Sequence, residues 1–283
     1  PHFPVTTDEW RDELQRRGTE MTAEGDHYWR YVPAGDYRIG GWTEDGRDDN
    51  DAEAMVELGA YWLAKYPVTG QQYAQFIAAG GYDNRDYWTD NGWQWKGDRA
   101  QPWRWEDTDY TSGNQPVIGV TWYEATAFAN WMHAHLVDEL PQGYRIRLPT
   151  EAQWEVACAY DAAGNRHPYP WGEQDPTREL ADFDDGSDLN GAAPVGGRPA
   201  GASAAGVQDM VGSVWERMTN SDAGYPAESG AVVADFATDE RDIPYRGGSW
   251  LSDDMRTSVR CAARDRYGPD YVFDVGFRLV LSP

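Results

Sequence analysis

Apolar residues recur at helical spacing in two stretches of otherwise polar sequence. Tyr73, Phe76 and Ile77 fall at i, i+3 and i+4 behind Thr69, a residue type suited to an N-cap, and predict a helix with one buried face. In the first 25 residues the same kind of stripe, more loosely spaced, is formed by Trp10, Leu14 and Met21. This second pattern predicts a peripheral helix ahead of the main domain.

Two further helices are predicted from their first turns. Thr121 with Glu124, and Thr150 with Gln153, each have the spacing of a capping box, in which the two side chains satisfy otherwise unpaired backbone N–H groups. The first helix is expected to continue through residues 125–136 and the second to end near Tyr160.

Short extended segments account for much of the remaining pattern. Aromatic-rich runs within 28–39 and 56–66 predict strands, and the chain beyond Asp161 consists of short strand-like pieces separated by Gly, Asp, Pro and Ser. Neither regular strand–helix alternation nor sustained helix is present, so a Rossmann fold, a barrel and a bundle are all disfavoured.

Composition narrows the class of protein. The 283 residues include 15 Trp and 17 Tyr, and 48 acidic against 24 basic residues give a formal net charge of −24. This charge repels a phosphate backbone, so nucleic-acid binding is not expected. No apolar run approaches the roughly 18 residues of a spanning helix, so we expect a soluble protein without membrane insertion. Because the chain begins at Pro1, we also expect that it lacks its native N-terminus.

The cysteines and histidines form no evident metal site. Cys158 and Cys261 are interpreted as buried thiols, and their separation does not indicate whether they pair. His133 and His135 lie two residues apart on a predicted helix and point to different faces, so they cannot chelate one ion together.

Eight short motifs follow one another along the chain. They are residues 32–40 (VPAGDYRIG), 65–69 (KYPVT), 116–122 (PVIGVTW), 147–155 (RLPTEAQWE), 169–172 (YPWG), 206–216 (GVQDMVGSVWE), 246–250 (RGGSW) and 275–278 (VGFR). The ordered set resembles the formylglycine-generating enzyme and sulfatase-modifying factor family. The resemblance implies one α+β domain of C-type-lectin-like fold over residues 28–283, with a small twisted antiparallel sheet, two or three helices and long irregular loops, preceded by an extension at 1–27.

The resemblance also bears on catalysis. In the family's oxidases a pair of cysteines after the Arg-Gly-Gly-Ser-aromatic motif binds copper, and the matching positions here are Ser252 and Thr257. A hydroxyl is not a soft copper ligand, so neither formylglycine generation nor copper is expected. A related branch uses iron held by a histidine-rich helical domain that is absent from this sequence, so iron is not expected either. We therefore expect a protein that is not an enzyme, and keep a catalytic member of the family as the alternative.

The segment between Trp250 and Val275 suggests a binding surface. Its candidate positions can all be encoded by codons that end in a pyrimidine, a pattern that resembles the variable proteins of diversity-generating retroelements; ordinary drift on a loop is the alternative. The positions are Leu251, Ser252, Asp253, Ser258, Asp265, Tyr267, Gly268, Tyr271, Val272, Phe273 and Asp274. Within a variable region at 246–278, we expect most of them to face solvent and to bind an unidentified protein or other macromolecular ligand.

The physical character of residues 271–273 fits this hypothesis. An exposed run of Tyr, Val and Phe is a patch that a monomer rarely keeps without a partner. The alternative is a buried strand that leads into the motif at 275–278.

Calcium is the one cofactor that the resemblance suggests, in a structural role. Relatives hold it with backbone carbonyls and carboxylates, and Ca²⁺ favours such oxygen-only shells. The matching residues are Asp182, Asp188, Asp209, Gly212, Val214 and Glu216. The alternative is that Glu216 pairs with an arginine.

Overall fold

The structure is a computed structural model that describes residues 2–42, 52–107, 113–184, 191–253, 258–270 and 273–283. Its α-helices are α1 (Thr7–Gln15), α2 (Gly70–Ala78), α3 (Asp90–Lys96), α5 (Trp122–Leu136) and α6 (Glu151–Ala159). Short 3₁₀ turns are η2 (Arg85–Tyr87), η3 (Val137–Glu139), η4 (Pro199–Gly201) and η5 (Asp222–Gly224). The strands are β1 (Trp29–Val32), β2 (Gly35–Gly40), β3 (Glu53–Leu58), β4 (Tyr61–Ala64), β5 (Arg145–Arg147), β6 (Trp215–Arg217), β7 (Ile243–Arg246), β8 (Arg264–Tyr267), β9 (Val275–Gly276) and β10 (Val280–Ser282).

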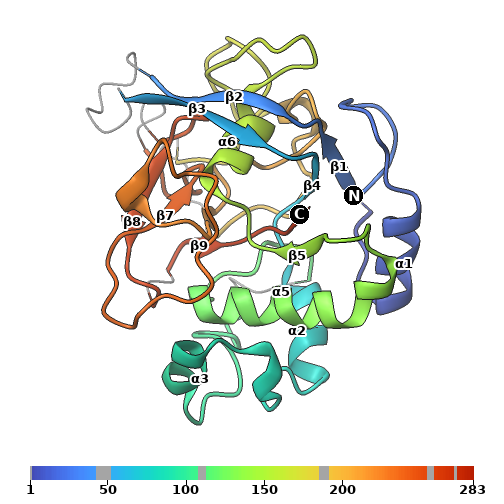
Figure 1. Cartoon of the computed structure of the whole chain (residues 1–283), viewed down its shortest axis with the longest axis vertical. Helices are drawn as coiled ribbons and strands as arrows, with labels where there is room; N and C mark the ends of the chain where they lie inside the picture. Colours follow the sequence, from blue (N-terminus) through green and yellow to red (C-terminus); the bar gives the residue numbers. More distant parts are fainter. Residues whose placement is uncertain (1, 43–51, 108–112, 185–190, 254–257, 271–272) are drawn as a thin grey trace.

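The strands form three small sheets (Figure 1). One sheet has the order β1-β4-β10-β5, a second is the β2–β3 ribbon, and the third has the order β8-β7-β6-β9. All pairings are antiparallel except that of β6 with β9. The α+β C-type-lectin-like prediction is confirmed. Its division into three sheets was not predictable from local patterns, because β10 enters the first sheet between strands that lie far from it in the sequence.

The predicted capped helices are present. Thr69, Thr121 and Thr150 each accept a hydrogen bond from the backbone N–H three residues on, and the residue at that position returns a side-chain bond to the threonine N–H. All three are therefore complete capping boxes. The short helix α3, capped by Thr89, was not predicted.

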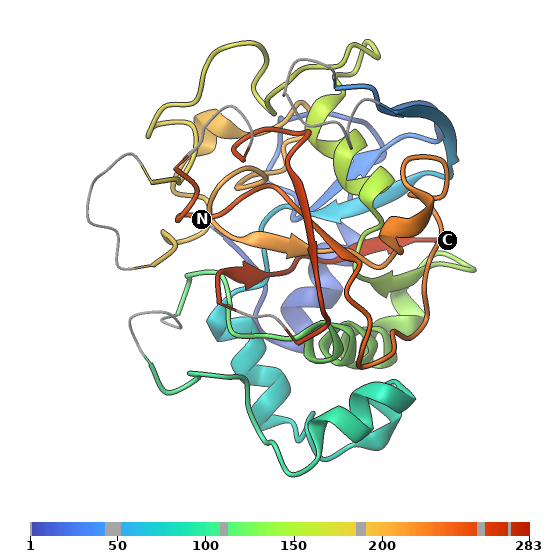
Figure 2. The same cartoon turned by 90° about the vertical axis from the view of Figure 1, so that its left-hand side faces the viewer.

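Helix α5 is the central element of the larger hydrophobic core. Its buried residues pack against the first sheet and α2, and Figure 2 shows α5 end-on, with α2 to its left, α3 below it and the C-terminal segment above. The predicted N-terminal helix is present as α1, and Trp10 and Leu14 are fully buried in the same core. Trp10 packs edge-on against Tyr28, with ring centroids 4.9 Å apart. Residues 7–15 are thus integrated with the domain that follows.

Candidate functional site

The segment between Trp250 and Val275, which we call the C-terminal segment, is held by a buried network of charged side chains. Glu151 and Glu155, one turn apart on α6, both accept bonds from Arg246, at 2.8 and 3.0 Å. Glu151 also accepts a hydrogen bond from the Arg264 guanidinium at 3.0 Å. Burial opposes ionisation of Glu151, but the two guanidiniums outweigh it and hold its pKa below the ordinary value. Removing one partner from such a network leaves an uncompensated buried charge, so these residues fix the backbone at 246 and 264 firmly.

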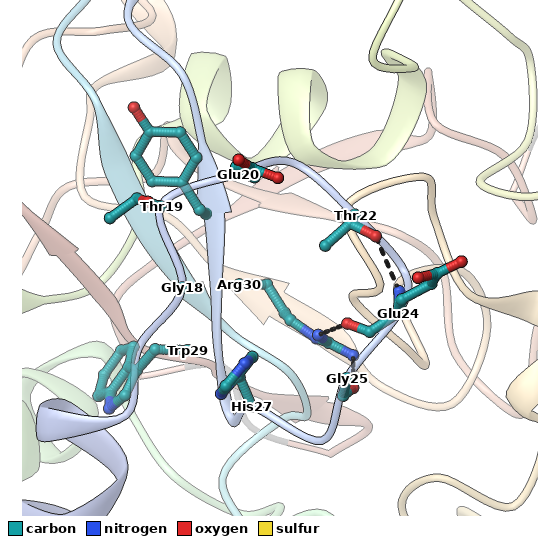
Figure 3. A pocket seen from close by; sticks show the side chains of 10 residues that line it. Gly18, Thr19, Glu20, Thr22, Glu24, Gly25, His27, Trp29 and Arg30 are labelled. Carbon is teal, nitrogen blue, oxygen red and sulfur yellow. Dashed lines mark hydrogen bonds between the residues drawn. The ribbon is translucent and has the colours of Figure 1, made fainter.

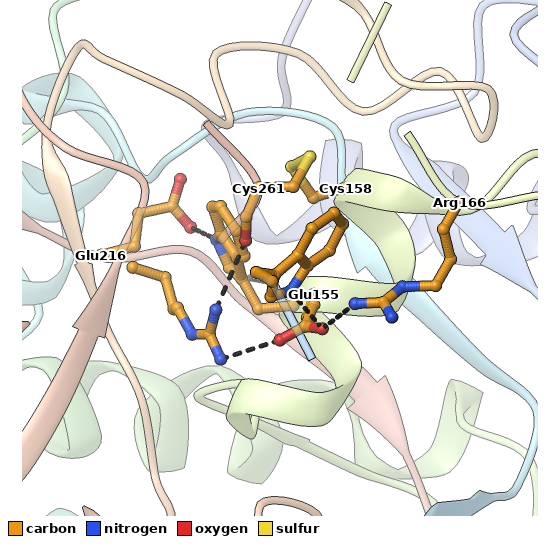
Figure 4. The surroundings of a disulfide bond; sticks show 8 residues. Glu155, Cys158, Arg166, Glu216 and Cys261 are labelled. Carbon is orange, nitrogen blue, oxygen red and sulfur yellow. Dashed lines mark hydrogen bonds and ion pairs between the residues drawn. A yellow bond between two sulfur atoms is a disulfide. The ribbon is translucent and has the colours of Figure 1, made fainter. Parts of the chain in front are cut away.

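The two cysteines lie at the edge of this network. Figure 4 shows Glu155, which points toward Arg166, and the disulfide that joins Cys158 of α6 to Cys261. The interpretation of two thiols was wrong, although both residues are buried as expected. Spacing in the sequence carried no information about the pairing, because only the fold brings α6 beside residue 261. The disulfide gives the C-terminal segment a covalent attachment to the scaffold.

A pocket of about 400 Å³ opens beside the C-terminal segment, at the start of α5. It is lined by Trp95, Arg99, Gln101, Pro102, Trp103, Gly119, Thr121, Glu124 and Asp270. Its walls therefore come from the α3 region, from the first turn of α5 and from the end of the C-terminal segment. We call it the aromatic–acid pocket.

Glu124 supplies a buried carboxylate to the aromatic–acid pocket. One oxygen accepts bonds from the Thr121 N–H at 2.8 Å and its hydroxyl at 2.9 Å, and the other accepts the Tyr82 hydroxyl at 2.6 Å. Burial raises the pKa of Glu124, although the bonds from Thr121 and Tyr82 oppose that rise. The carboxylate is thus held in one orientation by three hydrogen bonds.

Two tryptophans supply aromatic surface. Trp103 is 51% exposed and packs against Phe273, with ring centroids 6.2 Å apart. The Arg99 guanidinium lies 4.5 Å from the centroid of the Trp95 ring. Gly119 allows the Trp103 backbone to approach, because its φ is +74° and a Cβ there would lie 2.3 Å from the Trp103 carbonyl oxygen. The pocket thus combines aromatic rings, a buried carboxylate and one guanidinium.

The predicted ligand-binding residues occupy mixed environments. Leu251, Asp253, Tyr267 and Phe273 are exposed, and Ser258 and Asp265 are half-buried. Tyr271 and Val272 lie outside the described residues, as does Thr257. Tyr267 stacks on Tyr245 across the β7–β8 pair, with ring centroids 5.7 Å apart. Among the described members of the predicted set, Phe273 forms a ring pair with Trp103, a wall residue of the aromatic–acid pocket.

Three of the predicted binding residues do not face solvent. Ser252 is 9% exposed, and its hydroxyl accepts the Ser249 N–H at 3.0 Å. Asp274 is 7% exposed and accepts the Ser249 hydroxyl at 2.6 Å. Gly268 is also buried. The expectation that Ser252 and Asp274 project outward was wrong, because both side chains are used to hold the loop that begins at Ser249.

The residues predicted to bind calcium are engaged with protein groups. Glu216 receives two bonds of 2.6 Å from Arg278, which is the alternative that the sequence left open. The Asp182 carboxylate accepts a hydrogen bond from Arg198 at 2.8 Å, and the Asp209 carboxylate accepts one from the Gly196 N–H at 2.6 Å. The Gly212 N–H donates to Gly247, and Val214 is buried in a small apolar cluster. Asp188 lies outside the described residues. Calcium stays a prediction, and the pairing of Glu216 argues against it.

A second pocket, of about 350 Å³, lies beside residues 18–31 (Figure 3). Arg30 points toward Glu24 and Gly25 and donates to their carbonyl oxygens at 3.1 Å each. The Thr22 hydroxyl accepts the Glu24 N–H. These bonds hold the loop against β1, so the Arg30 guanidinium in this pocket fixes the backbone at residues 24 and 25.

The residues that line the aromatic–acid pocket were not predicted from the sequence as a site. Trp95 and Trp103 belong to a stretch with five tryptophans between residues 88 and 105, a density that could have directed attention there. Glu124 was identified only as part of a capping box, and Asp270 was not among the candidate positions of the C-terminal segment. Nothing local indicated that these residues meet, because the fold brings residue 270 to the start of α5 through a bond from the Trp122 N–H to the Pro269 carbonyl.

Comparison with known proteins shows two kinds of similarity. Residues 3–283 match the model of the sulfatase-modifying factor enzyme 1-like domain. The chain is 34% identical over 244 residues to hercynine oxygenase of Mycolicibacterium smegmatis, covering 77% of this chain and 53% of that protein. It is 36% identical over 236 residues to hercynine oxygenase of Mycolicibacterium thermoresistibile, covering 75% and 49%. The chain thus spans about half the length of the curated relatives it matches.

Solved structures support the fold. PvdO from Pseudomonas aeruginosa superposes with a TM-score of 0.65 at 23% identity, over 95% of this chain and 99% of that one. Treponema denticola variable protein 1 superposes with a TM-score of 0.59 at 20% identity, over 90% and 95%.

These comparisons correct one expectation, and the structure itself bears on another. The expectation that the chain is not an enzyme is overturned, because the hercynine oxygenases to which it is similar are catalytic proteins. In the described part of the chain, no helix is both long enough and apolar enough to cross a membrane.

Proposed function

Because the chain belongs to the sulfatase-modifying factor enzyme 1-like family, we propose that it forms the substrate-binding part of an oxygenase similar to the hercynine oxygenases. The substrate we infer is a small zwitterion that carries a quaternary ammonium group, the class to which the betaine hercynine belongs. The aromatic–acid pocket is the site we assign to it. The single observation that carries the proposal is the meeting of Trp95, Trp103 and Glu124 in that pocket.

The pocket has the chemistry that such a cation needs. A quaternary ammonium group cannot donate hydrogen bonds, so it is recognised by aromatic faces and by a nearby negative charge. Trp95 and Trp103 offer the faces, and Glu124 and Asp270 offer carboxylates. The ring faces at this place already attract cations, since Arg104 lies 5.3 Å from the centroid of Trp103. Arg99 is the group that would bind the carboxylate end of the zwitterion.

The residues do not fit a metal centre. Ser252, at the position of a copper-binding cysteine in the family's oxidases, carries a hydroxyl that is bonded to the Ser249 backbone. Within the ranges that the structure describes, which include all five histidines, no three His, Cys, Asp or Glu side chains converge on one point. The function that these residues support is therefore recognition and orientation of the substrate.

Binding of a macromolecule is a second candidate function. Leu251, Tyr267 and Phe273 expose apolar surface from the C-terminal segment, as a partner-binding surface would. The fold similarity to a variable protein is compatible with this candidate but shows only the fold. Such binding would use the surface around the pocket and does not replace the proposed substrate site.

Titration calorimetry with hercynine tests the proposal. The Trp103→Ala variant should stay folded, because the ring is half exposed, and should bind hercynine about threefold to tenfold more weakly than the unmodified chain, as expected for one cation–π contact. Met55→Ala is the matched control, since Met55 is an exposed apolar residue on β3 that does not line the pocket. It should bind like the unmodified chain. An unmodified chain that does not bind hercynine, or equal binding by Trp103→Ala, would contradict the assignment.

A further inference from the structure

A third pocket, with different chemistry, lies on another face of α5. It measures about 660 Å³ and is lined by Trp122, Thr126, Asn130, Arg145, Arg147, Leu148, Thr219, Gly230, Val232, Val233, Ala234 and Pro283. We call it the arginine pocket. It shares no lining residue with the aromatic–acid pocket. Trp122 and Thr126, one turn apart, face the arginine pocket, whereas Thr121 and Glu124 face the other.

Two arginines reach this pocket because of strand geometry. On β5, Ile146 is buried in the core, and alternation places Arg145 and Arg147 together on the opposite face. On α5, Thr126 and Asn130 lie at i and i+4 and line the same pocket, forming a polar stripe on a helix whose other residues are mostly buried. The sequence thus directs four polar side chains into one cavity.

The charge of the pocket is unusual for this protein. The chain carries a net charge of −24, yet no Asp or Glu is present among the described residues that line the arginine pocket. Arg145 is exposed and Arg147 half-buried, and neither makes an ion pair with a carboxylate side chain in the described ranges, whereas the buried Arg246, Arg264 and Arg278 do. Burial and the neighbouring Arg145 lower the pKa of Arg147 to about 10, so the Arg147 guanidinium remains charged at neutral pH.

Polar atoms in the pocket also have unused bonding capacity. Arg147 donates through Nη1 to the backbone oxygen of Pro283, the last residue of the sequence, at 2.5 Å, but its Nε has no hydrogen-bond partner within the described structure. The same holds for the Thr126 hydroxyl, although both atoms are buried. A buried polar atom without a partner is destabilising, and a hydrogen bond to a bound ligand would relieve that cost.

The opposite wall is apolar and ordered. Val232 and Val233 lie on a loop that is pinned to Thr219 by two bonds, from the Val233 N–H at 2.8 Å and from the Thr219 hydroxyl at 3.2 Å. Val232 is exposed toward solvent. The pocket therefore pairs a cationic, bond-donating side with a fixed apolar side.

We propose that the arginine pocket binds a small organic anion, whose carboxylate or phosphate group is held by Arg145, Arg147 and the Thr126 hydroxyl while its apolar part packs on Val232 and Val233. Paired guanidiniums suit planar or tetrahedral anions, and charge-assisted bonds to them are strong. This site is separate from the substrate pocket, so its occupancy and that of the substrate site can be measured independently.

Calorimetry with four probes tests this inference. Phenyl phosphate and benzoate carry the two candidate anionic groups on an apolar ring, inorganic phosphate lacks the ring, and benzyl alcohol lacks the charge. We expect phenyl phosphate or benzoate to bind, and which of them binds more tightly identifies the anionic group. Inorganic phosphate should bind more weakly and benzyl alcohol not at all. Equal binding of inorganic phosphate and phenyl phosphate, or no binding of either aromatic anion, would overturn the proposal.

Variants separate the site from the overall charge. Arg145→Gln/Arg147→Gln should lower the affinity for the bound anion about tenfold or more. Arg38→Gln/Arg241→Gln changes the net charge equally at exposed positions away from the pocket and should leave the affinity unchanged. Thr126→Val keeps the shape, should fold at least as stably because the hydroxyl has no partner, and should lower the affinity about threefold to tenfold. Equal losses in both double variants would show that only long-range charge acts and would overturn the site.

Discussion

The ring of Trp103 lies 6.2 Å from the ring of Phe273, although one precedes α5 and the other follows β8. Both rings are partly exposed, at 51% and 37%. The contact joins the tryptophan-rich stretch to the C-terminal segment at the mouth of the aromatic–acid pocket. The position of the Trp103 ring therefore depends on a residue that was predicted to be freely variable.

Replacing Phe273 by Ala should weaken binding of hercynine without unfolding the protein. An exposed ring contributes little to the free energy of unfolding, within about 0.5 kcal/mol, but its loss leaves the Trp103 ring less constrained. Leu251→Ala is the control, because Leu251 is exposed on the same segment and does not line the pocket. Calorimetry and thermal melts of both variants check this, and a large fall in melting temperature for Phe273→Ala would show that the ring is a core residue.

Glu124 makes cation binding depend on pH. Its pKa is raised by burial, and a cation is attracted only by the ionised carboxylate. Affinity for tetramethylammonium, a cation that does not titrate, should therefore fall as the pH is lowered through a midpoint above the ordinary Glu value of about 4.3. Glu124→Gln should bind more weakly at pH 7 and lose this dependence.

The substitution by glutamine is a controlled one. Gln72 and Gln153 occupy the same position in the capping boxes of α2 and α6, so a glutamine at 124 retains the cap of α5. Binding that is independent of pH in the unmodified chain would place the cation elsewhere.

Asp209 should make the folded state more stable at mildly acidic pH. Burial raises the pKa of Asp209 to about 6 from 3.8. A carboxyl group with a raised folded-state pKa contributes stability that is complete below the unfolded value and is lost as the pH rises through the folded value. The free energy of unfolding should therefore gain about 1–3 kcal/mol from this group between pH 7 and pH 4, and Asp209→Asn should remove that gain.

Asp209→Asn is suited to the comparison because Asp209 has a φ of 55°, which asparagine tolerates well. Asp36→Asn, at an exposed position on β2, is the control and should leave the pH dependence of urea unfolding unchanged. The same pH dependence in Asp209→Asn as in the unmodified protein would assign the effect to another group.

Loss of the disulfide should lower stability markedly. The bond closes a loop between residues 158 and 261, with a sequence separation of 103, and removal of such a cross-link typically costs about 2–5 kcal/mol. Cys158→Ala/Cys261→Ala should therefore melt at a lower temperature and become insensitive to reductant. Mass spectrometry after alkylation without reduction should find no free thiol; two alkylated cysteines would rule out the bond.

The fold was more accessible from sequence than the site. Thr69, Thr121 and Thr150 predicted helix starts because capping is a local interaction between residues three apart. Sheet order and the Cys158–Cys261 bond depend on which distant segments meet, and periodicity carries no such information. Likewise Ser252 and Asp274 were expected at the surface, but each bonds to Ser249.

The site residues were hidden for a related reason. Glu124 has a local role, as the reciprocal partner of Thr121, that fully explains its presence in the sequence. The binding role that we propose for it depends on Trp95, Trp103 and Asp270, distant in the sequence, lining the same pocket. A residue with one sufficient structural explanation gives no separate signal of a second function.

The most direct test of the central claim compares hercynine with histidine by calorimetry on the unmodified chain. The two differ in the methylation of the amino group, so the comparison isolates recognition of the quaternary ammonium. If Trp95, Trp103 and Glu124 form that site, hercynine should bind about threefold to tenfold more tightly than histidine, the advantage expected from aromatic recognition of a weakly hydrated cation. Equal affinities, or tighter binding of histidine, would contradict the assignment of the aromatic–acid pocket as a substrate site for quaternary ammonium zwitterions.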